Sequence, residues 1–244
     1  MKDMICPRCN SGNIVKNGNT LYGKPKFMCK DCRKQFVENP DIRKITDEKK
    51  ILIDKMLLEK ISLAGICRVL GISKRWLQTY VDEKYQDAKK KVETIFKGKT
   101  RLTIECDEIC SYVGNKKNKC WIWLAIDTKT GEIVGFYAGS RGKEGAKGLW
   151  DSLPPEYRQC AVIYTDFWEA YAGVLPSKRH RRAAKNSGKT SHIERFNNTL
   201  RQRISRLVRK TLSFSKKIEN HIGAILLFII YYNTMIKKEI TDTI

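Results

Sequence analysis

Residues 160–171 read CAVIYTDFWEAY, an apolar run that meets a carboxylate and then passes into a helix-like segment. The continuous apolar stretch Cys160–Thr165 is typical of a strand buried on both faces of a sheet. Asp166 follows it directly, and Phe167–Tyr171 has the character of a short helix. In α/β layers, functional sites lie at the carboxyl ends of such strands. The stretch therefore predicts an α/β fold with a candidate site at Asp166.

Three strands are expected before this stretch, joined as a hairpin meander. They are rich in β-branched and aromatic residues, and the turn TKTG at 128–131 separates the last two. A helix is expected between the meander and the buried strand, ended by two prolines. These segments are Leu102–Val113, Trp121–Asp127, Glu132–Gly139, the helix Gly145–Leu153, and Pro154-Pro155. Their order predicts a mixed sheet with helices packed against it.

The first two strands carry three further candidate carboxylates. Asp107 and Glu108 are neighbours in the first strand, so a regular strand points them to opposite faces. Only one of them can therefore be a ligand in a shared site, and alternation alone does not choose between them. Asp127 ends the second strand, where capping of the turn before Thr130-Gly131 is the alternative to a role in the site.

Glu194 lies in a strongly basic region of the chain. From Val174 to Lys217 it is the only acidic residue, against fourteen Lys and Arg. It is one position, or about 100°, away from an apolar stripe on an expected helix, so it should border the core. Arg201 follows two turns later on the same face. The stripe consists of Ile193, Phe196, Leu200, Ile204 and Leu207.

Glu194 taken alone is readily explained by an ion pair, but the set of a carboxylate in the first strand, Asp166 and Glu194 favours metal binding. Phosphodiester chemistry commonly uses two divalent ions about 3.5–4 Å apart. Carboxylate oxygens suit Mg²⁺ or Mn²⁺. Nearby, His192 is expected either to position DNA or to cap the helix, and Trp168 to be a core residue rather than a base-stacking surface.

Four cysteines near the start of the chain form a second pattern. Cys6-Pro-Arg-Cys9 and Cys29-Lys-Asp-Cys32 are two CxxC knuckles separated by 19 residues. Two knuckles supply the four thiolates of a tetrahedral structural Zn²⁺ site. Because so short a segment has little apolar content, metal binding is expected to supply its folding free energy.

A helical region is expected between this zinc ribbon and the strands. Thr46, Ser62 and Ser73 are candidate caps for three helices, and Gly71 breaks the chain between the second and the third. Two short helices joined by a glycine turn predict a helix-turn-helix whose second helix enters the DNA major groove. The residues expected to meet DNA are Lys74, Arg75, Gln78 and Thr79.

The net charge is +22, with 48 Lys and Arg against 26 Asp and Glu, which favours a nucleic-acid partner. The start, MKDMICPRCN, has no apolar signal core, so the nine cysteines indicate a reducing, cytoplasmic compartment. With DNA as the expected partner, the protein is expected to be associated with the nucleoid. Ile222–Tyr232 is too short an apolar run to span a bilayer and is expected to be a buried helix closing the core.

The sequence resembles transposases of the insertion-sequence-one (IS-one) family over nearly its whole length. The similar stretches are LTIECDEICSYVGNKKNK at 102–119, WIWLAIDTKTGEIVGFYAGSR at 121–141, VIYTDFWEAYAGVLP at 162–176 and HIERFNNTLRQRISRLVRKTLSFSK at 192–216. These are DDE transposases with a ribonuclease-H-like catalytic core. Ribbon, helix-turn-helix and core are continuous in this chain, which resembles the fused, full-length form.

The resemblance implies roles for individual residues. Asp107, Asp166 and Glu194 would be the DDE triad that binds two Mg²⁺ or Mn²⁺ ions, with Asp107 preferred over Glu108. Arg201 would contact terminal DNA phosphates, and His192, Arg203 and Arg206 are further expected DNA contacts. The implied domains are a zinc ribbon at 1–40, a helix-turn-helix at 41–88, a linker at 89–100 and the catalytic domain at 101–244.

The implied activity is binding of terminal inverted repeats, cleavage that frees 3′-hydroxyls, and joining to target DNA, by a homodimer or larger assembly. Two other functions remain open at this stage. A regulator without catalysis would use only about the first 85 residues and leave the triad unexplained. A ribonuclease-H-like nuclease would cut DNA without joining it.

Overall fold

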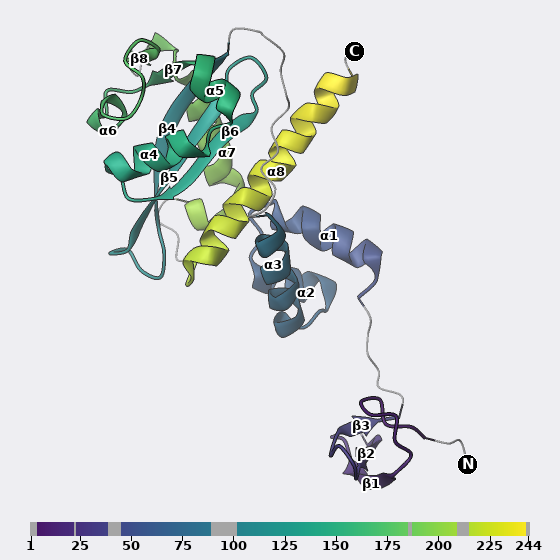
Figure 1. The fold of residues 1–244 in the computed structure, drawn as a ribbon. Helices are drawn as coiled ribbons and strands as arrows, with labels where there is room; N and C mark the ends of the chain where they lie inside the picture. Colours follow the sequence, from purple (N-terminus) through teal and green to yellow (C-terminus); the bar gives the residue numbers. More distant parts are fainter. Residues whose placement is uncertain are drawn as a thin grey trace. The chain divides into compact units, whose positions relative to one another are not determined.

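The computed structural model divides the chain into two compact units, Met1–Glu48 and Lys49–Ile244 (Figure 1). The linker expected at 89–100 lies outside the described residues. The structure describes residues 4–21, 23–38, 45–88, 102–184, 187–208 and 215–242, the last of these with side chains up to 238.

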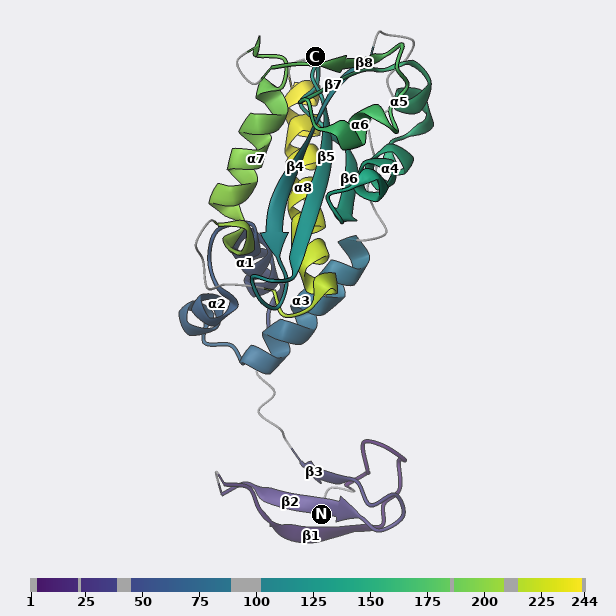
Figure 2. The same cartoon turned by 90° about the vertical axis from the view of Figure 1, so that its left-hand side faces the viewer.

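The first unit is built on a small antiparallel sheet of order β1-β2-β3, seen in Figure 2. Its strands are β1 (Ile14–Asn19), β2 (Pro25–Cys29) and β3 (Gln35–Val37). The two CxxC knuckles turn in the same way, because Asn10 and Arg33, each directly after a second cysteine, have φ of 56° and 57°.

Three helices open the second unit: α1 (Asp47–Leu57), α2 (Leu63–Leu70) and α3 (Lys74–Ala88). The expected caps of α2 and α3 are confirmed, since Ser62 Oγ accepts from Gly65 N and Ser73 Oγ from Trp76 N, both at 3.1 Å. Gly71 ends α2 with φ 62°, a left-handed conformation that glycine adopts at little cost.

A five-stranded mixed sheet of order β6-β5-β4-β7-β8 forms the centre of the second unit. The first three strands are antiparallel neighbours, as expected, while β4 pairs with β7 and β7 with β8 in parallel. The strands are β4 (Thr103–Tyr112), β5 (Lys119–Asp127), β6 (Ile133–Gly139), β7 (Val162–Thr165) and β8 (His180–Arg182).

Two details of the sheet differ from expectation. The strand β7 begins at Val162, and its side chains alternate between buried and half-buried, so it is not buried on both faces. Cys160 instead ends the short helix α5 (Pro155–Cys160), because Pro155, expected to end a helix, begins one at a position where its missing N–H costs nothing. The edge strand β8 was not expected, since its sequence HRR has no apolar alternation.

Helices cover both faces of the sheet (Figures 1 and 2). On one face, α4 (Lys143–Ser152), α5 and α6 (Glu169–Ala172) pack over a core that includes Trp123 and Tyr171. On the other face, α7 (Ser191–Arg203) and α8 (Ile218–Asp242) pack over a core that includes Ile122 and Leu124.

The expected buried helix at Ile222–Tyr232 is confirmed as part of α8, where Ile225, Phe228 and Ile229 are buried. Within the described residues, none of the helices has the length and apolar character needed to cross a bilayer. The helix expected to carry the whole stripe to Leu207 is shorter than predicted. It ends at Arg203 because Ile204 is extended, and a 3-10 turn then brings Leu207 into the same core.

The three N-terminal helices of the second unit are packed on its core through α3 and α8. Gly223 permits their close approach, since a Cβ there would lie 2.4 Å from Cβ of Tyr85. Asn220 Nδ2 donates to Asp82 Oδ1 at 3.1 Å across the same contact. The C-terminal half of α3 is therefore anchored, and Lys74, Arg75 and Thr79 at its start are exposed.

Candidate active site and metal centres

The sheet brings Asp107 and Asp166 to the same level of two neighbouring strands. In the parallel pairing of β4 with β7, Glu105 lies opposite Tyr164. Two residues further along each chain are Asp107 and Asp166, the latter directly after the end of β7. Asp166 therefore lies directly after the end of a strand, as predicted, and beside the carboxylate of Asp107.

One pocket of about 460 Å³ contains the three carboxylates expected to act together, Asp107, Asp166 and Glu194, and also Arg201. They come from β4, from the end of β7 and from α7, so segments separated by up to 94 residues converge there. The rest of the lining is Cys106, Glu108, Trp121, Arg141, Thr190, Asn197 and Asn198.

Asp107 and Glu108 point to opposite faces of the sheet, as alternation requires. Asp107 Oδ2 accepts a hydrogen bond from Asn197 Nδ2 on α7 at 2.7 Å. Glu108 turns toward α6 and accepts a hydrogen bond from the Tyr171 hydroxyl on that helix at 3.1 Å. It also accepts one from Arg141, which follows β6, at 3.1 Å. The carboxylate of Glu108 is thus already paired with a cation, whereas Asp107 is held by a neutral amide.

Both carboxyl groups have raised pKa values. Burial raises the pKa of Asp107 to about 6, with a further contribution from the negative charge of Asp166. Burial likewise raises the pKa of Glu108 to about 7, together with the charges of Asp107 and Asp166. The pocket therefore holds concentrated negative charge that a bound cation would stabilise.

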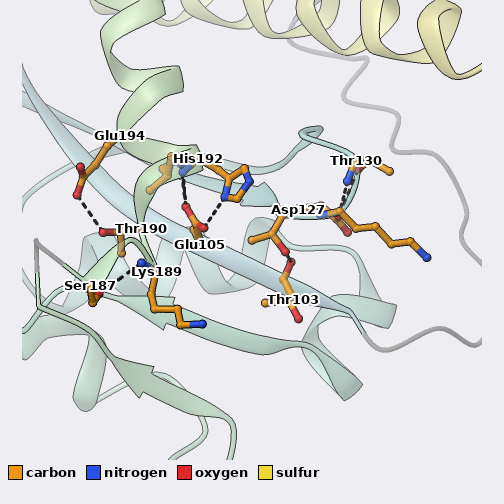
Figure 3. A network of polar contacts seen from close by, with 12 residues as sticks. Thr103, Glu105, Asp127, Thr130, Ser187, Lys189, Thr190, His192 and Glu194 are labelled. Atoms are coloured by element: carbon orange, nitrogen blue, oxygen red, sulfur yellow. Dashed lines mark hydrogen bonds and ion pairs between the residues drawn. The ribbon is translucent and has the colours of Figure 1, made fainter.

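Glu194 differs from expectation in its surroundings. It is exposed rather than at the edge of the core, and Thr190 Oγ1 donates to its Oε1 at 2.9 Å (Figure 3). Among the ion pairs between described residues, none includes Glu194. The ion-pair explanation of this glutamate therefore finds no support in the described part of the chain.

The donors in this pocket fit hard divalent ions. Carboxylate oxygens are the ligands that Mg²⁺ and Mn²⁺ prefer, and the pocket presents four carboxyl groups, of Asp107, Glu108, Asp166 and Glu194. Among the described residues, only the four cysteines have three or more ligand atoms within 4.8 Å of one another, so the carboxylates are more widely spaced.

The four cysteines of the first unit form a compact thiolate site. Cys6 Sγ lies 3.6 Å from Cys32 Sγ, and Cys9 Sγ lies 3.6 Å from Cys29 Sγ. A tetrahedron with Zn–S bonds of about 2.3 Å has edges of about 3.8 Å, so this spacing suits zinc. The predicted pairing of two knuckles around one centre is confirmed by the geometry.

Two protein-family models match parts of this chain. The family model described as IS1 transposase matches residues 101–233, more than half of the 244 residues. The chain belongs to the IS1 transposase family. The model of the InsA N-terminal domain, a zinc ribbon, matches residues 3–33. The InsA-type ribbon and the IS1 transposase domain are therefore fused in this chain.

Individual IS1 proteins are similar to about half of the chain. The insertion element iso-IS1n protein InsB of Shigella dysenteriae is 38% identical over 130 residues, which are 52% of this chain and 94% of that protein. The insertion element IS1 protein InsB of Shigella sonnei is 36% identical over 117 residues, 48% of this chain and 86% of that protein. The insertion element IS1 4 protein InsB of Escherichia coli strain K12 is 36% identical over 117 residues, which are 48% of this chain and 67% of that protein.

Sequence reasoning missed Glu105, which connects the first strand of the central sheet, β4, to α7. Its side chain is 3% exposed and accepts from His192 N at 2.8 Å, Ile193 N at 3.0 Å and His192 Nδ1 at 2.7 Å (Figure 3). It therefore caps the helix that carries Glu194. The available signal was its position two residues before Asp107, on the same face of a buried strand.

The structure decides between the alternatives for Asp127 but not between those for His192. The ring of His192 is 44% exposed and contacts Glu105 at the start of α7, so its contact with DNA stays a prediction. Asp127 Oδ1 accepts from the backbone of Lys129 at 2.8 Å and of Thr130 at 2.9 Å (Figure 3), so its predicted turn-capping alternative is confirmed. Neither residue lines the carboxylate pocket.

Two of the arginines expected to meet DNA make contacts within the chain. Arg203 pairs with Glu59, and its guanidinium lies 5.2 Å from the centre of the Phe228 ring. Arg206 donates to the carbonyl of Asn220 and lies 5.4 Å from the Tyr85 ring. Both help to join the N-terminal helices to the core, so their contact with DNA stays a prediction.

Proposed function

We propose that this chain is a DNA transposase that cleaves the ends of an insertion sequence and joins the freed 3′-hydroxyls to target DNA. The observation that carries the proposal is the convergence of Asp107, Asp166 and Glu194 on one pocket with Arg201, in a chain of the IS1 transposase family. The catalytic core is of the ribonuclease-H-like class. The order of three antiparallel strands followed by parallel ones supports this assignment.

The three carboxylates would hold two Mg²⁺ or Mn²⁺ ions, which supply activation of the attacking oxygen and stabilisation of the leaving oxygen. Asp107, rather than Glu108, is the first ligand, because Glu108 is already bound by Arg141 and Tyr171. Asn197 holds the carboxylate of Asp107 in place, and Thr190 does the same for Glu194. These contacts fix the ligands before substrate arrives.

The remaining parts of the chain bind and position DNA. Arg201 would contact a phosphate near the cleaved bond, since it lines the same pocket. The helices α2 and α3 form a helix-turn-helix that reads the terminal repeats with the exposed Lys74, Arg75 and Thr79. Gln78 would act beside them, although its amide also donates to Asp82 at 2.8 Å. Two ends must be joined together, so a homodimer or larger assembly is expected.

Purified protein should be incubated with duplexes that carry the element's terminal repeats, with and without Mg²⁺. The proposal predicts metal-dependent nicking at the repeat end and joining of pre-cleaved ends to a second duplex. Cutting without joining would indicate a nuclease, and specific binding without either reaction would indicate a regulator.

A further inference from the structure

Arg141, which follows β6, is fixed between two tryptophans at the edge of the carboxylate pocket. The guanidinium carbon lies 4.4 Å from the centre of the Trp121 ring and 4.1 Å from that of Trp168. The indole Nε1 of Trp168 also donates to the carbonyl of Arg141 at 3.1 Å, which holds the backbone. The guanidinium is therefore in cation–π contact with two aromatic rings.

One edge of the guanidinium is occupied as well. Nε and Nη2 donate to the same oxygen of Glu108, at 3.2 Å and 3.1 Å. A guanidinium carries five N–H groups in a fixed plane, so these two bonds leave three donors, two of which lie on the edge formed by Nη1 and Nη2. The Arg141 side chain is 42% exposed, whereas that of Glu108 is 3% exposed. The open edge is therefore the part of this group that a ligand can reach.

The neighbours of Arg141 indicate what that ligand is. Arg141 lines the pocket that holds Asp107, Asp166 and Glu194, and Arg201 lines it from α7. A planar pair of N–H donors matches two oxygens of a phosphate group, and arginine prefers such bidentate contacts. Stacking on two rings means that little side-chain freedom is lost on binding.

We propose that the open Nη1–Nη2 edge of Arg141 binds a phosphate group of the cleaved DNA strand, next to the phosphate group at which cleavage takes place. The inference rests on the proposed function, because it takes DNA as the occupant of the pocket. Arg141 and Arg201 then hold the strand on two sides of the carboxylates, one from the loop after β6 and one from α7. Glu108 orients the guanidinium, and the two tryptophans keep it in plane.

The competing explanation is that Arg141 only neutralises the buried Glu108. The two explanations differ in a double variant. If Arg141 only neutralises Glu108, the double variant Glu108→Gln/Arg141→Gln, in which both charges are replaced by amides, should recover both the thermal stability and the DNA contact that Arg141→Gln loses. If Arg141 binds phosphate, the double variant should regain thermal stability but not the contact with DNA.

The test measures binding of a pre-cleaved repeat end at several salt concentrations without divalent metal, and the melting temperature of each variant. Arg141→Gln should lower the slope of log K against log salt by about 0.9, the value for one lost phosphate contact. Lys147→Gln is the matched control, because Lys147 is an exposed cation on α4 outside the pocket. Its slope should equal that of the wild type.

An unchanged slope in Arg141→Gln, or a double variant with the wild-type slope, would overturn the inference. Strand transfer by the wild type is measured separately with Mg²⁺. If the wild type does not join ends while Arg141→Gln still lowers the slope, the proposed function fails and the phosphate contact stands.

Discussion

The carboxylate of Glu105 on β4 binds both the backbone N and the ring Nδ1 of His192 at the start of α7, at 2.8 Å and 2.7 Å. Two residues along β4, Asp107 binds Asn197 on the same helix at 2.7 Å. Two strand residues rise about 6.7 Å, and the five helical residues from His192 to Asn197 rise about 7.5 Å, so both contacts fit one alignment of strand and helix. Glu194 lies between the two contact points, and its position relative to Asp107 is thereby fixed.

Replacing Glu105 should consequently reduce catalysis by more than its effect on folding explains. Glu105→Ala leaves buried N–H groups at the start of α7 without an acceptor, at a cost of about 1–3 kcal/mol. Mg²⁺-dependent cleavage, measured well below the melting temperature, should still fall at least tenfold. Glu105→Gln keeps one oxygen for the two backbone N–H groups and should recover most of the activity. If folded Glu105→Ala cleaves at the wild-type rate, the contact is only structural.

The raised pKa values of Asp107 and Glu108 predict an inverse dependence of stability on pH in metal-free protein. Because their pKa values rise to about 6 and about 7, the folded protein keeps protons that the unfolded chain releases. The contribution of these two protonated carboxyl groups to the free energy of unfolding is fully present below about pH 4 and is lost as the pH rises toward 7. Asp107→Asn should therefore raise the metal-free melting temperature at pH 7.5.

Added Mg²⁺ distinguishes the two neighbours. It should raise the melting temperature of the wild type and of Glu108→Gln at pH 7.5, but not that of Asp107→Asn. Stabilisation of Asp107→Asn, together with its loss in Glu108→Gln, would make Glu108 the ligand.

The zinc ribbon should depend on its metal for both folding and DNA recognition. Cys29→Ser removes a buried thiolate from the four-cysteine site, and three thiolates make a poor structural zinc centre. Zinc content measured by metal analysis should fall, and specific binding of the repeat should fall with it. Full specific binding by zinc-free Cys29→Ser protein would show that the ribbon has no part in recognition.

The sequence predicted elements where local patterns are strong. Segments rich in β-branched and aromatic residues predicted β4, β5 and β6. Ser62 and Ser73 predicted two helix starts, and the cysteine spacing predicted the thiolate site. It failed where tertiary contacts decide. The edge strand β8 has no pattern of its own and exists because β7 offers it a partner.

The candidate site shows the same division. Asp166, Glu194 and a carboxylate in the first strand were predicted from residue type and position, and the family resemblance favoured Asp107 over Glu108. The structure adds that the two neighbours have different partners on opposite faces of the sheet. Glu105 and Arg141 were missed because their functions depend on residues 87 and 20–33 positions away in the chain. Such contacts leave no periodic trace in the sequence.

The central claim, that Glu194 is present to bind metal, is tested most directly by Glu194→Gln. The side chain is exposed and its described partner is Thr190, so an amide of the same shape should leave the melting temperature of the metal-free protein close to that of the wild type. An amide oxygen is a much weaker ligand for a hard divalent ion than a carboxylate.

Melting temperature and Mg²⁺-dependent cleavage of a repeat end should be measured on the same preparation of Glu194→Gln. If Glu194 binds metal, the melting temperature should be unchanged and cleavage should fall by several orders of magnitude. A variant that is destabilised but still cleaves at the wild-type rate would contradict metal binding by Glu194.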